Sequence, residues 1–437
     1  MPDPNRAIDA FRSLGTPGEL RDLAARGYAP ARRPRTNAHV HLPPNFSAFG
    51  SVAHAIELAA EQGVRVLGAA NYYDHAVYGD LLELALERGI FPLFGLEIVC
   101  MIPELRDAGA RVNDPGNPGK TYLCGKGIMR FADPPPEAAR RLAAIRTRDG
   151  SRVAAMIAAT EQIFAARGLP TGLDADAVVD RVVRRHGCPP SSVCLQERHV
   201  AQAFQEAAFA RLPAARRSSW LAEVLGRPTR ARDAEDAAAL QDDLRACLMK
   251  AGRPAFVPEA FVSFAEACDL ILELGGVPCY PVLADGHAPL SPFEDPCDRL
   301  VQNLRERNLH AAELIPVRNE PAVLARYVRA LRSAGLIVTA GTEHNTLDLI
   351  PIEPTCRGGI ALPDDLQATF WEGACVIAGH QFLTAHGELG YVDRAGRPNP
   401  GFSDAASRIA SFAALGGAVI RRYFENAPRN AERDQDA

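Results

Sequence analysis

Apolar residues in the first part of the chain follow two different patterns. The continuous apolar run at 64–70 is typical of a strand that is buried on both faces of a parallel sheet, and strands are also predicted at 36–41 and at 90–99, where Pro92 and Gly95 interrupt the apolar residues. Between them, apolar positions recur every three or four residues, which predicts helices over 51–62 and 80–89. This alternation of strand and helix predicts an α/β fold with parallel strands covered by helices.

The pattern changes between residues 131 and 258, where alanine, arginine and glutamate dominate and strand-like runs are missing. Helical spacing extends over 137–148, 151–167, 174–186, 197–211 and 233–250. We interpret this stretch as an all-helical insertion. It is either a lid that recognises substrate or a bundle that serves solubility or oligomerisation.

Strand and helix alternate again after residue 259. Strands are predicted at 277–281, 312–317 and 336–340, and helices at 263–275, 320–333 and 366–385. The expected organisation is a leader (1–35), a first part of the α/β domain (36–130), the helical insertion (131–258), a second part (259–390) and a polar, frayed tail (391–437).

Composition narrows the class of protein. Of 437 residues, 47% are hydrophobic, which is enough for a large core, and the net charge of -5 gives no electrostatic case for nucleic acid as a partner. None of the ten cysteines forms a Cys-x-x-Cys motif, as in a reduced protein. Without a signal-peptide pattern or an apolar run near the ~20 residues of a membrane span, we expect a cytoplasmic protein.

Ionisable residues gather where the predicted strands end. His39 and His41 occupy alternate positions of one strand, so both imidazoles face the same side. Asp74 and His75 follow the second strand, and Glu97 belongs to the third. Active sites of parallel sheets and barrels lie at the carboxyl ends of the strands. Imidazoles and carboxylates together predict a site for zinc, manganese or iron.

The later strands add further groups. Glu343 follows the apolar strand 336–340 at a glycine, where a ligand can be exposed above a barrel. Lys126, Arg318 and Arg357 lie in or near strand ends, and each is either a phosphate clamp or a solvated loop charge. Lys126 and Arg318 are the preferred pair.

The order of these motifs resembles the polymerase and histidinol phosphatase (PHP) superfamily, over residues 36–130 and 259–350. The resemblance rests on His-x-His at 39–41, Asp74-His75, Gly95-x-Glu97 and Gly341-Thr342-Glu343-His344-Asn345. It implies a distorted (β/α)7 barrel, here interrupted by the helical insertion, and a metal-dependent phosphoesterase.

The resemblance is partial, and the departures change the metal set that it implies. Tyr122 and Tyr280 stand where the superfamily carries histidines, and they are expected to donate hydrogen bonds to substrate instead. The resemblance then implies one metal position and allows a second through His75 and His344. The residues of the first position are His39, His41, Glu97 and Glu343. Whether His344 or Asn345 takes the late position stays open.

The function expected from these residues is hydrolysis of a small anionic phosphorylated metabolite, with His75 or His344 and Asp74 protonating the leaving oxygen. Substrate binding is expected from Lys126, Arg318, Tyr122, Tyr280, Asn345 and Arg357. Two alternatives remain: hydrolysis of an amide or lactone, and a degenerate barrel that binds metal without catalysis. The sequence does not indicate an oligomeric state.

Overall fold

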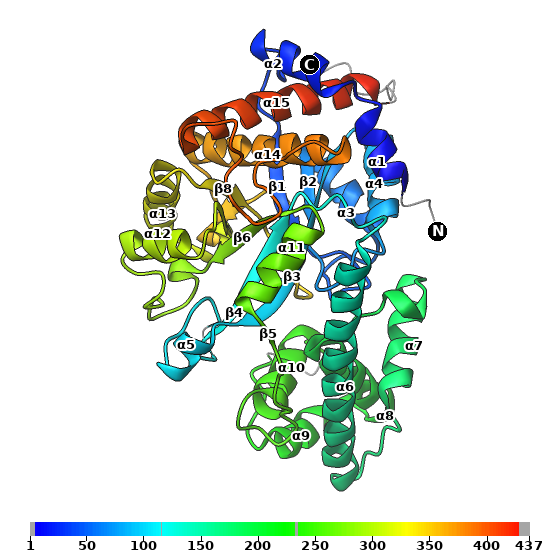
Figure 1. Ribbon diagram of the computed structural model, residues 1–437. Helices are drawn as coiled ribbons and strands as arrows, with labels where there is room; N and C mark the ends of the chain where they lie inside the picture. Colours follow the sequence, from blue (N-terminus) through cyan, green and yellow to red (C-terminus); the bar gives the residue numbers. More distant parts are fainter. Residues whose placement is uncertain (1–4, 115, 232–234, 428–437) are drawn as a thin grey trace.

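The computed structural model describes residues 5–114, 116–231 and 235–427. Its centre is a curved sheet in the order β1-β2-β3-β4-β6-β7-β8 (Figure 1). These strands are β1 (Arg35–Val40), β2 (Val64–Ala69), β3 (Phe91–Met101), β4 (Lys120–Lys126), β6 (Val277–Val282), β7 (Ala311–Leu314) and β8 (Ile337–Ala340). A parallel bridge between Val40 and Glu343 joins the two edges, so the sheet is a nearly closed barrel.

Strand direction explains why the barrel is distorted. β4 runs antiparallel to both of its neighbours, β3 and β6, whereas the other pairs along the barrel are parallel. The short strand β5 (Val262–Ser263) adds to β3, and β9 (Thr355–Cys356) pairs with β10 (Ile360–Ala361) outside the barrel. The predicted α/β barrel is confirmed, but the antiparallel strand was not foreseen.

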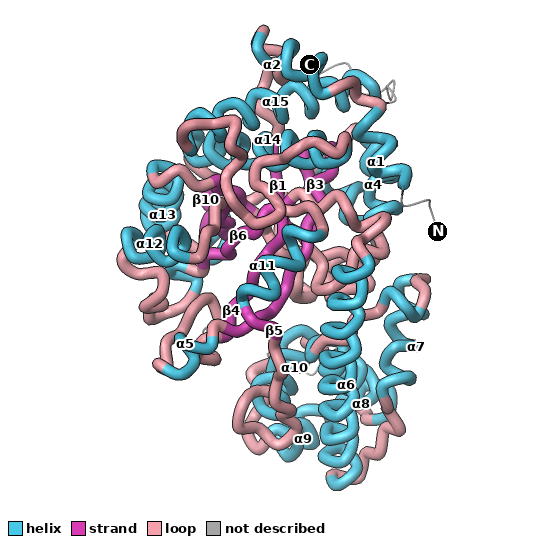
Figure 2. Tube along the Cα trace, in the orientation of Figure 1, coloured by secondary structure: helices cyan, strands magenta, loops and turns pink. Residues whose placement is uncertain are grey.

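Helices cover the outside of the barrel (Figure 2). They are α3 (Val52–Glu61), α4 (Tyr78–Arg88), α5 (Pro103–Asp107), α11 (Phe264–Glu273), α12 (Cys297–Glu306) and α13 (Pro321–Ser333), with short 3-10 turns η3 (Ala284–Gly286), η4 (Pro316–Arg318) and η5 (Arg357–Gly359). Ser51 caps α3 and accepts a hydrogen bond from the His54 backbone, and Ser263 forms a capping box with Glu266 at the start of α11.

Two long helices, α14 (Asp364–Ala385) and α15 (Ala405–Asn426), cross over one end of the barrel (Figure 1). The expectation of a frayed tail after residue 391 is wrong for α15, because Phe412, Ile420 and Tyr423 on this helix are buried in the main core. Residues 428–437 of that tail lie outside the described residues.

The N-terminal residues form two helices, α1 (Asn5–Arg12) and α2 (Pro17–Ala25). Leu20 is fully buried, and the ring of Phe11 lies edge-on to the ring of Phe91 with 5.6 Å between centroids. The predicted leader therefore packs against the barrel through α1 and against α15 (Ala405–Asn426) through α2.

The helical stretch forms a separate lobe beside the barrel (Figure 1). It contains α6 (Pro136–Ala166), α7 (Ala175–His186), η1 (Pro190–Ser192), α8 (Glu197–Arg211), α9 (Ala214–Leu225), α10 (Ala237–Leu244) and the π-helix η2 (Arg245–Met249). Its own hydrophobic cluster includes Phe164, Phe204 and Trp220. We call this lobe the helical insertion.

Three details of the insertion differ from the sequence prediction. The helices expected at 137–148 and 151–167 are one helix, α6, because Gly150 lies inside it without ending it. The helix α9 was not predicted. The helix expected at 233–250 begins at Ala237, and its first two predicted residues lie outside the described part of the chain.

Among the helices that the structure describes, none combines the length and apolar character needed to cross a bilayer.

Candidate metal centre

Two histidines and one glutamate meet inside the barrel. His39 in β1 and His41 just after it place their Nε2 atoms 3.3 Å apart. Oε2 of Glu97, from β3, lies 3.1 Å from Nε2 of His41 and 3.8 Å from Nε2 of His39. All three side chains are buried. The structure brings these three predicted residues together, with His39 and Glu97 lying within β1 and β3 and not after the ends of these strands.

The donor atoms of this group fit a divalent metal. Oε2 of Glu97 is buried and has no hydrogen-bond partner, which is costly for a carboxylate unless something else binds it. Within the described residues, His39, His41 and Glu97 form a group whose ligand atoms all lie within 4.8 Å of one another. Two imidazole nitrogens and one carboxylate are the donor set of zinc, manganese and iron sites.

A carboxylate that was not among the predicted site residues fixes the orientation of the His39 ring, on the side away from Glu97. Nδ1 of His39 lies 2.7 Å from Oε1 of Glu313, a fully buried residue of β7. Burial alone would raise the pKa of Glu313, but Lys126 and His39 lower it to about 2, so the carboxylate stays ionised. An ionised carboxylate accepts the Nδ1 proton, and this leaves the lone pair of Nε2 directed at Glu97.

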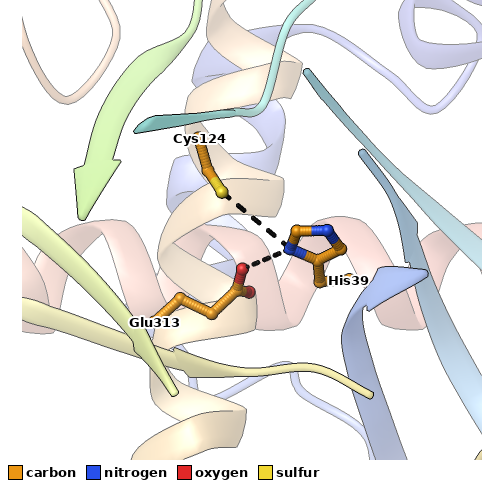
Figure 3. A group of neighbouring side chains, drawn as sticks. All are labelled: His39, Cys124 and Glu313. Atoms are coloured by element: carbon orange, nitrogen blue, oxygen red, sulfur yellow. Dashed lines mark hydrogen bonds and ion pairs between the residues drawn. The ribbon is translucent and has the colours of Figure 1, made fainter. Parts of the chain in front are cut away.

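A second group of ligand-type residues, His39, Cys124 and Glu313, lies on the other side of the same imidazole (Figure 3). Sγ of Cys124 is 3.9 Å from Nδ1 of His39. This group is a support and not a metal site, because the ammonium of Lys126 already binds both oxygens of Glu313, at 2.7 and 2.6 Å. Burial also raises the pKa of Cys124, which keeps its thiol protonated.

The prediction that Lys126 binds substrate phosphate is therefore wrong. The Lys126 side chain is 4% exposed, and its Nζ donates to Glu313 and to the Ala38 carbonyl oxygen at 3.0 Å. The available sequence signal was Glu313 itself, a charged residue inside an otherwise apolar strand, which calls for a buried cation as its partner.

We call His39, His41 and Glu97 the metal group. Glu343 faces it from the loop that follows β8. The bridge to β1 holds its backbone, and both Glu343 and His344 have positive φ angles, 60° and 54°. Its carboxylate accepts from Nη1 of Arg318 at 2.9 Å, again from Nη2 of Arg318, and from Nδ2 of Asn345 at 2.7 Å. The pKa of Glu343 is lowered, because the nearby cations outweigh burial.

A cavity of about 280 Å³ opens over these groups, and we call it the metal cavity. Its walls include Glu97, Glu343, Arg318, Tyr72, Tyr122 and Asn345. The ring of Tyr72 stacks on the ring of His41 with 4.9 Å between centroids. Burial raises the pKa of Tyr122 to about 12, so its phenol is protonated and can donate a hydrogen bond.

His344 points away from the metal group, so the prediction that it binds metal or transfers a proton is wrong. One ring nitrogen lies 2.8 Å from Oγ1 of Thr342 and the other 2.9 Å from the carbonyl oxygen of Ile350. The ring also stacks on Phe49. The neighbouring Asn345 lines the cavity together with Glu343, whereas His344 does not.

Asp74 and His75 form a separate pair near the insertion. Oδ1 of Asp74 accepts a hydrogen bond from Nη1 of Arg146 in α6 at 2.9 Å. Burial lowers the pKa of His75 to about 4, and its buried Nε2 has no hydrogen-bond partner. Within the described residues, no three-ligand group includes His75, so the structure offers no second metal position of the expected kind.

Of the other residues predicted to bind substrate, some bond only to the protein and others line the metal cavity. Tyr280 is fully buried and donates to Oε1 of Glu294 at 2.9 Å, so its predicted contact with substrate is wrong. Arg357 donates to the carbonyl oxygen of Asp285 at 2.6 Å and to that of Arg318, and so it fastens the Arg318 loop. Arg318 and Tyr122 remain at the cavity.

Comparison with known proteins shows the fold. A solved structure from Bifidobacterium adolescentis, described as a candidate metal-dependent phosphoesterase, matches with a TM-score of 0.50 and 17% identity, over 79% of this chain and 97% of that one. An amidohydrolase from Chromobacterium violaceum, solved with bound sulfate and no metal, has a TM-score of 0.47 and 18% identity over 77% and 96%. No protein-family model and no curated protein matches the chain.

Proposed function

We propose that this chain is a metal-dependent hydrolase of the PHP type that cleaves phosphoric monoesters of small anionic molecules. The observation that carries this proposal is the convergence of His39, His41 and Glu97, with the free carboxylate oxygen of Glu97 buried at the meeting point. The fold shared with the Bifidobacterium structure supports it, because that protein is described as a phosphoesterase.

A divalent zinc, manganese or iron ion would supply a Lewis acid and an activated water at this point. His39, His41 and Glu97 would hold the ion, and Glu313 would keep His39 in the tautomer that binds it. Glu343 lies beside the ligands but is hydrogen-bonded to Arg318. It would either orient this arginine or release it and bind the metal as a further ligand.

The chain itself supplies the groups that a phosphoryl substrate needs. Arg318 lines the metal cavity and presents a guanidinium, whose planar donors match phosphate oxygens. Tyr122 is held protonated by burial and can donate a hydrogen bond, or a proton, to the leaving oxygen. Tyr72 stacks on His41 and restricts the ligand ring to one orientation.

Amide or lactone hydrolysis is the second candidate. Among the described residues, only one group of three ligands is available to a metal, because the other is bonded to Lys126. This favours the second candidate, since one metal ion with an activated water is sufficient for acyl transfer. The two candidates differ in their need for Arg318. A phosphoryl group carries charge that the guanidinium must neutralise, whereas a neutral amide does not.

Turnover of p-nitrophenyl phosphate by purified protein loaded with Mn²⁺, Zn²⁺ or Fe²⁺ tests the proposal. We expect metal-dependent hydrolysis that Arg318→Gln lowers by about 100-fold or more in kcat/KM, the scale of a lost charge-stabilising donor. The exposed Arg299 provides the control, because Arg299→Gln removes the same charge away from the cavity. Hydrolysis of amides or lactones in the absence of any phosphatase activity would contradict the proposal.

A further inference from the structure

A large cavity lies between the barrel and the helical insertion, and we call it the insertion cavity. Its volume is about 450 Å³. The barrel contributes Tyr72 and Tyr122, and the insertion contributes Arg152 of α6, Arg198 of α8 and Arg245 of η2. Its lining is therefore shared by two parts of the chain that each have a hydrophobic core of their own.

This cavity is strongly cationic, in a chain whose net charge is -5. Three carboxylates line it, those of Asp149, Glu197 and Glu259. They are outnumbered by six cationic side chains, those of Lys120, Arg148, Arg152, Arg198, Arg245 and Lys250. A concave wall with excess positive charge attracts anions and binds them more strongly than an open surface does.

Part of the positive charge is neutralised within the wall. Nζ of Lys120 lies 2.9 Å from both carboxylate oxygens of Glu259, and Nε of Arg152 lies 2.8 Å from Asp149. Glu197 accepts from Nζ of Lys250 at 2.5 Å. These pairs use all three carboxylates that line the cavity. Of the other cations, Arg245 donates from Nη1 to Oδ1 of Asp242 at 3.2 Å, and Arg148 donates from Nη1 to the carbonyl oxygen of Ala260 at 3.4 Å.

Two guanidinium nitrogens in the wall are buried without a hydrogen-bond acceptor: Nη1 of Arg152 and Nε of Arg245. The Arg152 side chain is only 10% exposed, and its Nη1 lies 3.6 Å from Oε1 of Glu197, too far for a hydrogen bond. A buried charged donor without an acceptor is costly, and a bound anion would remove that cost.

Arg198 is in a similar position at the end of the cavity near the metal group. Nη1 of Arg198 lies 3.6 Å from Oδ1 of Asp242, which is an ion pair but not a hydrogen bond. Burial and the neighbouring Arg245 lower the pKa of Arg198 to about 10, as expected where positive charge is crowded. The geometry and the electrostatics agree that positive charge exceeds negative charge in this wall.

The insertion cavity adjoins the site proposed above. Tyr72, Tyr122 and Asn345 line both the insertion cavity and the metal cavity. A small molecule with its reacting group at His39, His41 and Glu97 would pass between these three side chains. Its other end would then face the cations of the insertion.

We propose that the insertion cavity binds a second anionic group of the substrate, a phosphate or a carboxylate, through Arg152, Arg198 and Arg245 of the helical insertion. This inference rests on the proposed function and narrows the substrate class to molecules with two anionic groups, one at each end. Tyr72 and Tyr122 form aromatic walls, which fit a substrate whose two anionic groups are joined by a flat or apolar segment.

Binding to the metal-free protein tests the subsite separately from catalysis. In a His39→Ala/His41→Ala background without divalent metal, calorimetry is carried out with inorganic pyrophosphate and, separately, with citrate. We expect one binding site per chain for at least one of the two anions, and the tighter binder identifies the group as phosphate or carboxylate. Adding Arg152→Gln and Arg245→Gln should weaken this binding at least tenfold.

The matched control is Arg253→Gln, since Arg253 is exposed and lies outside the cavity wall. If the double arginine variant does not fold, as judged by circular dichroism, Arg198→Gln replaces it, because Arg198 belongs to the proposed site and its side chain is 24% exposed. Absence of binding for both anions, or equal weakening by Arg253→Gln, would overturn the proposal.

Substrate preference provides the catalytic arm. The ratio of kcat/KM for 4-carboxyphenyl phosphate to that for phenyl phosphate should be about tenfold or more in the wild type and should fall to about one in Arg152→Gln/Arg245→Gln, mainly through KM. An unchanged ratio would contradict the subsite even if the enzyme is active. If neither ester is hydrolysed, the proposed function fails, and the calorimetric result still decides the subsite.

Discussion

At the scale of single residues, the metal group depends on a buried ion pair that never contacts the cavity. Lys126 in β4 and Glu313 in β7 bind each other at 2.6 Å, and Glu313 in turn binds Nδ1 of His39. Thr339 is the third partner of Glu313 and donates a hydrogen bond to it at 3.0 Å. The charge of Lys126 therefore determines how His39 presents its other nitrogen.

Glu313→Gln should weaken metal binding by about 10- to 100-fold, the usual effect of losing the hydrogen-bond partner of a ligand histidine. An amide cannot stabilise the Nδ1 proton as a carboxylate does. Competition with a chelating dye measures the dissociation constant. Thr339→Val is the matched control, since it removes one hydrogen bond to Glu313 and keeps its charge. Equal metal affinity for Glu313→Gln and the wild type would contradict this role.

Lys126→Met should lower the free energy of unfolding by about 3–5 kcal/mol, because Glu313 would be left as a buried charge without its cation. Urea denaturation of the metal-free protein measures this value. Replacing both partners, as in Lys126→Met/Glu313→Leu, should recover part of the loss. A loss in the double variant as large as in the single one would contradict the pairing.

The sequence predicts the three central donors because their spacing along strands has a geometric meaning. His39 and His41 share a face by strand periodicity, and Glu97 lies on a nearby strand of the same sheet. The pairing of Lys126 with Glu313 could not be predicted, since these residues are 187 positions apart and their strands are not neighbours. Without that pairing, Lys126 resembles a free phosphate-binding lysine.

At the scale of elements, the two helices above the barrel pack closely because glycines lie at their contacts. A Cβ atom at Gly416 of α15 would lie 1.8 Å from the carbonyl oxygen of Cys375 in α14. A Cβ atom at Gly373 of α14 would lie 2.2 Å from the carbonyl oxygen of Val338 in β8. The helices therefore approach the barrel and each other backbone to backbone.

Gly416→Ala should destabilise the protein by about 3 kcal/mol or more, because the obstruction is backbone and cannot rotate away. Gly150→Ala provides the opposite control: it lies inside α6, and no described atom lies within 4 Å of the position that a methyl group would take, so alanine should stabilise by about 0.5–1 kcal/mol. Chemical denaturation measures both. A neutral Gly416→Ala would contradict the packing described for α14 and α15.

Element prediction succeeded where periodicity was strong and failed where tertiary contacts decide. The helix expected at 197–211 is α8 with the same bounds, since its apolar positions face the core of the insertion. The direction of β4 could not be predicted, because it depends on whether the chain after β3 turns back beside this strand or crosses over the sheet. Helix α15 was not predicted, because polar residues on its exposed face interrupt the apolar residues that it buries.

At the scale of the whole molecule, burial of neutral histidines makes stability depend on pH. Burial lowers the pKa of His380 to about 4. Nδ1 of His380 accepts the Tyr391 backbone proton at 3.0 Å, and Nε2 donates to the Gly275 carbonyl oxygen at 2.9 Å. Both nitrogens are used by the neutral ring, so protonation would break the contact with Tyr391.

Between pH 6.5 and pH 4, the unfolded chain binds a proton at His380 that the folded chain does not, so stability is present above this window and falls as pH decreases through it. This residue should contribute about 1.4 kcal/mol per pH unit. Urea unfolding at several values in that window measures the slope, which should be smaller in His380→Gln. Identical slopes would contradict the buried neutral state.

The barrel and the helical insertion contact each other beside the proposed site. Arg146 of α6 binds Asp74 at the end of β2, and the backbone of Phe46 donates to Oε1 of Gln196 at 2.9 Å. These contacts place the cationic wall of the insertion opposite the metal group. The barrel could thus supply the reacting centre and the insertion the selectivity.

The central claim is that His39, His41 and Glu97 hold one metal ion. Its most direct test is metal analysis by inductively coupled plasma mass spectrometry after reconstitution with Mn²⁺, Zn²⁺ or Fe²⁺ and removal of excess metal. We predict one ion per wild-type chain, less than about one tenth of that in His41→Ala and Glu97→Gln, and full content in the control His54→Gln. Full occupancy in His41→Ala, or no stoichiometric metal in the wild type, would contradict the claim.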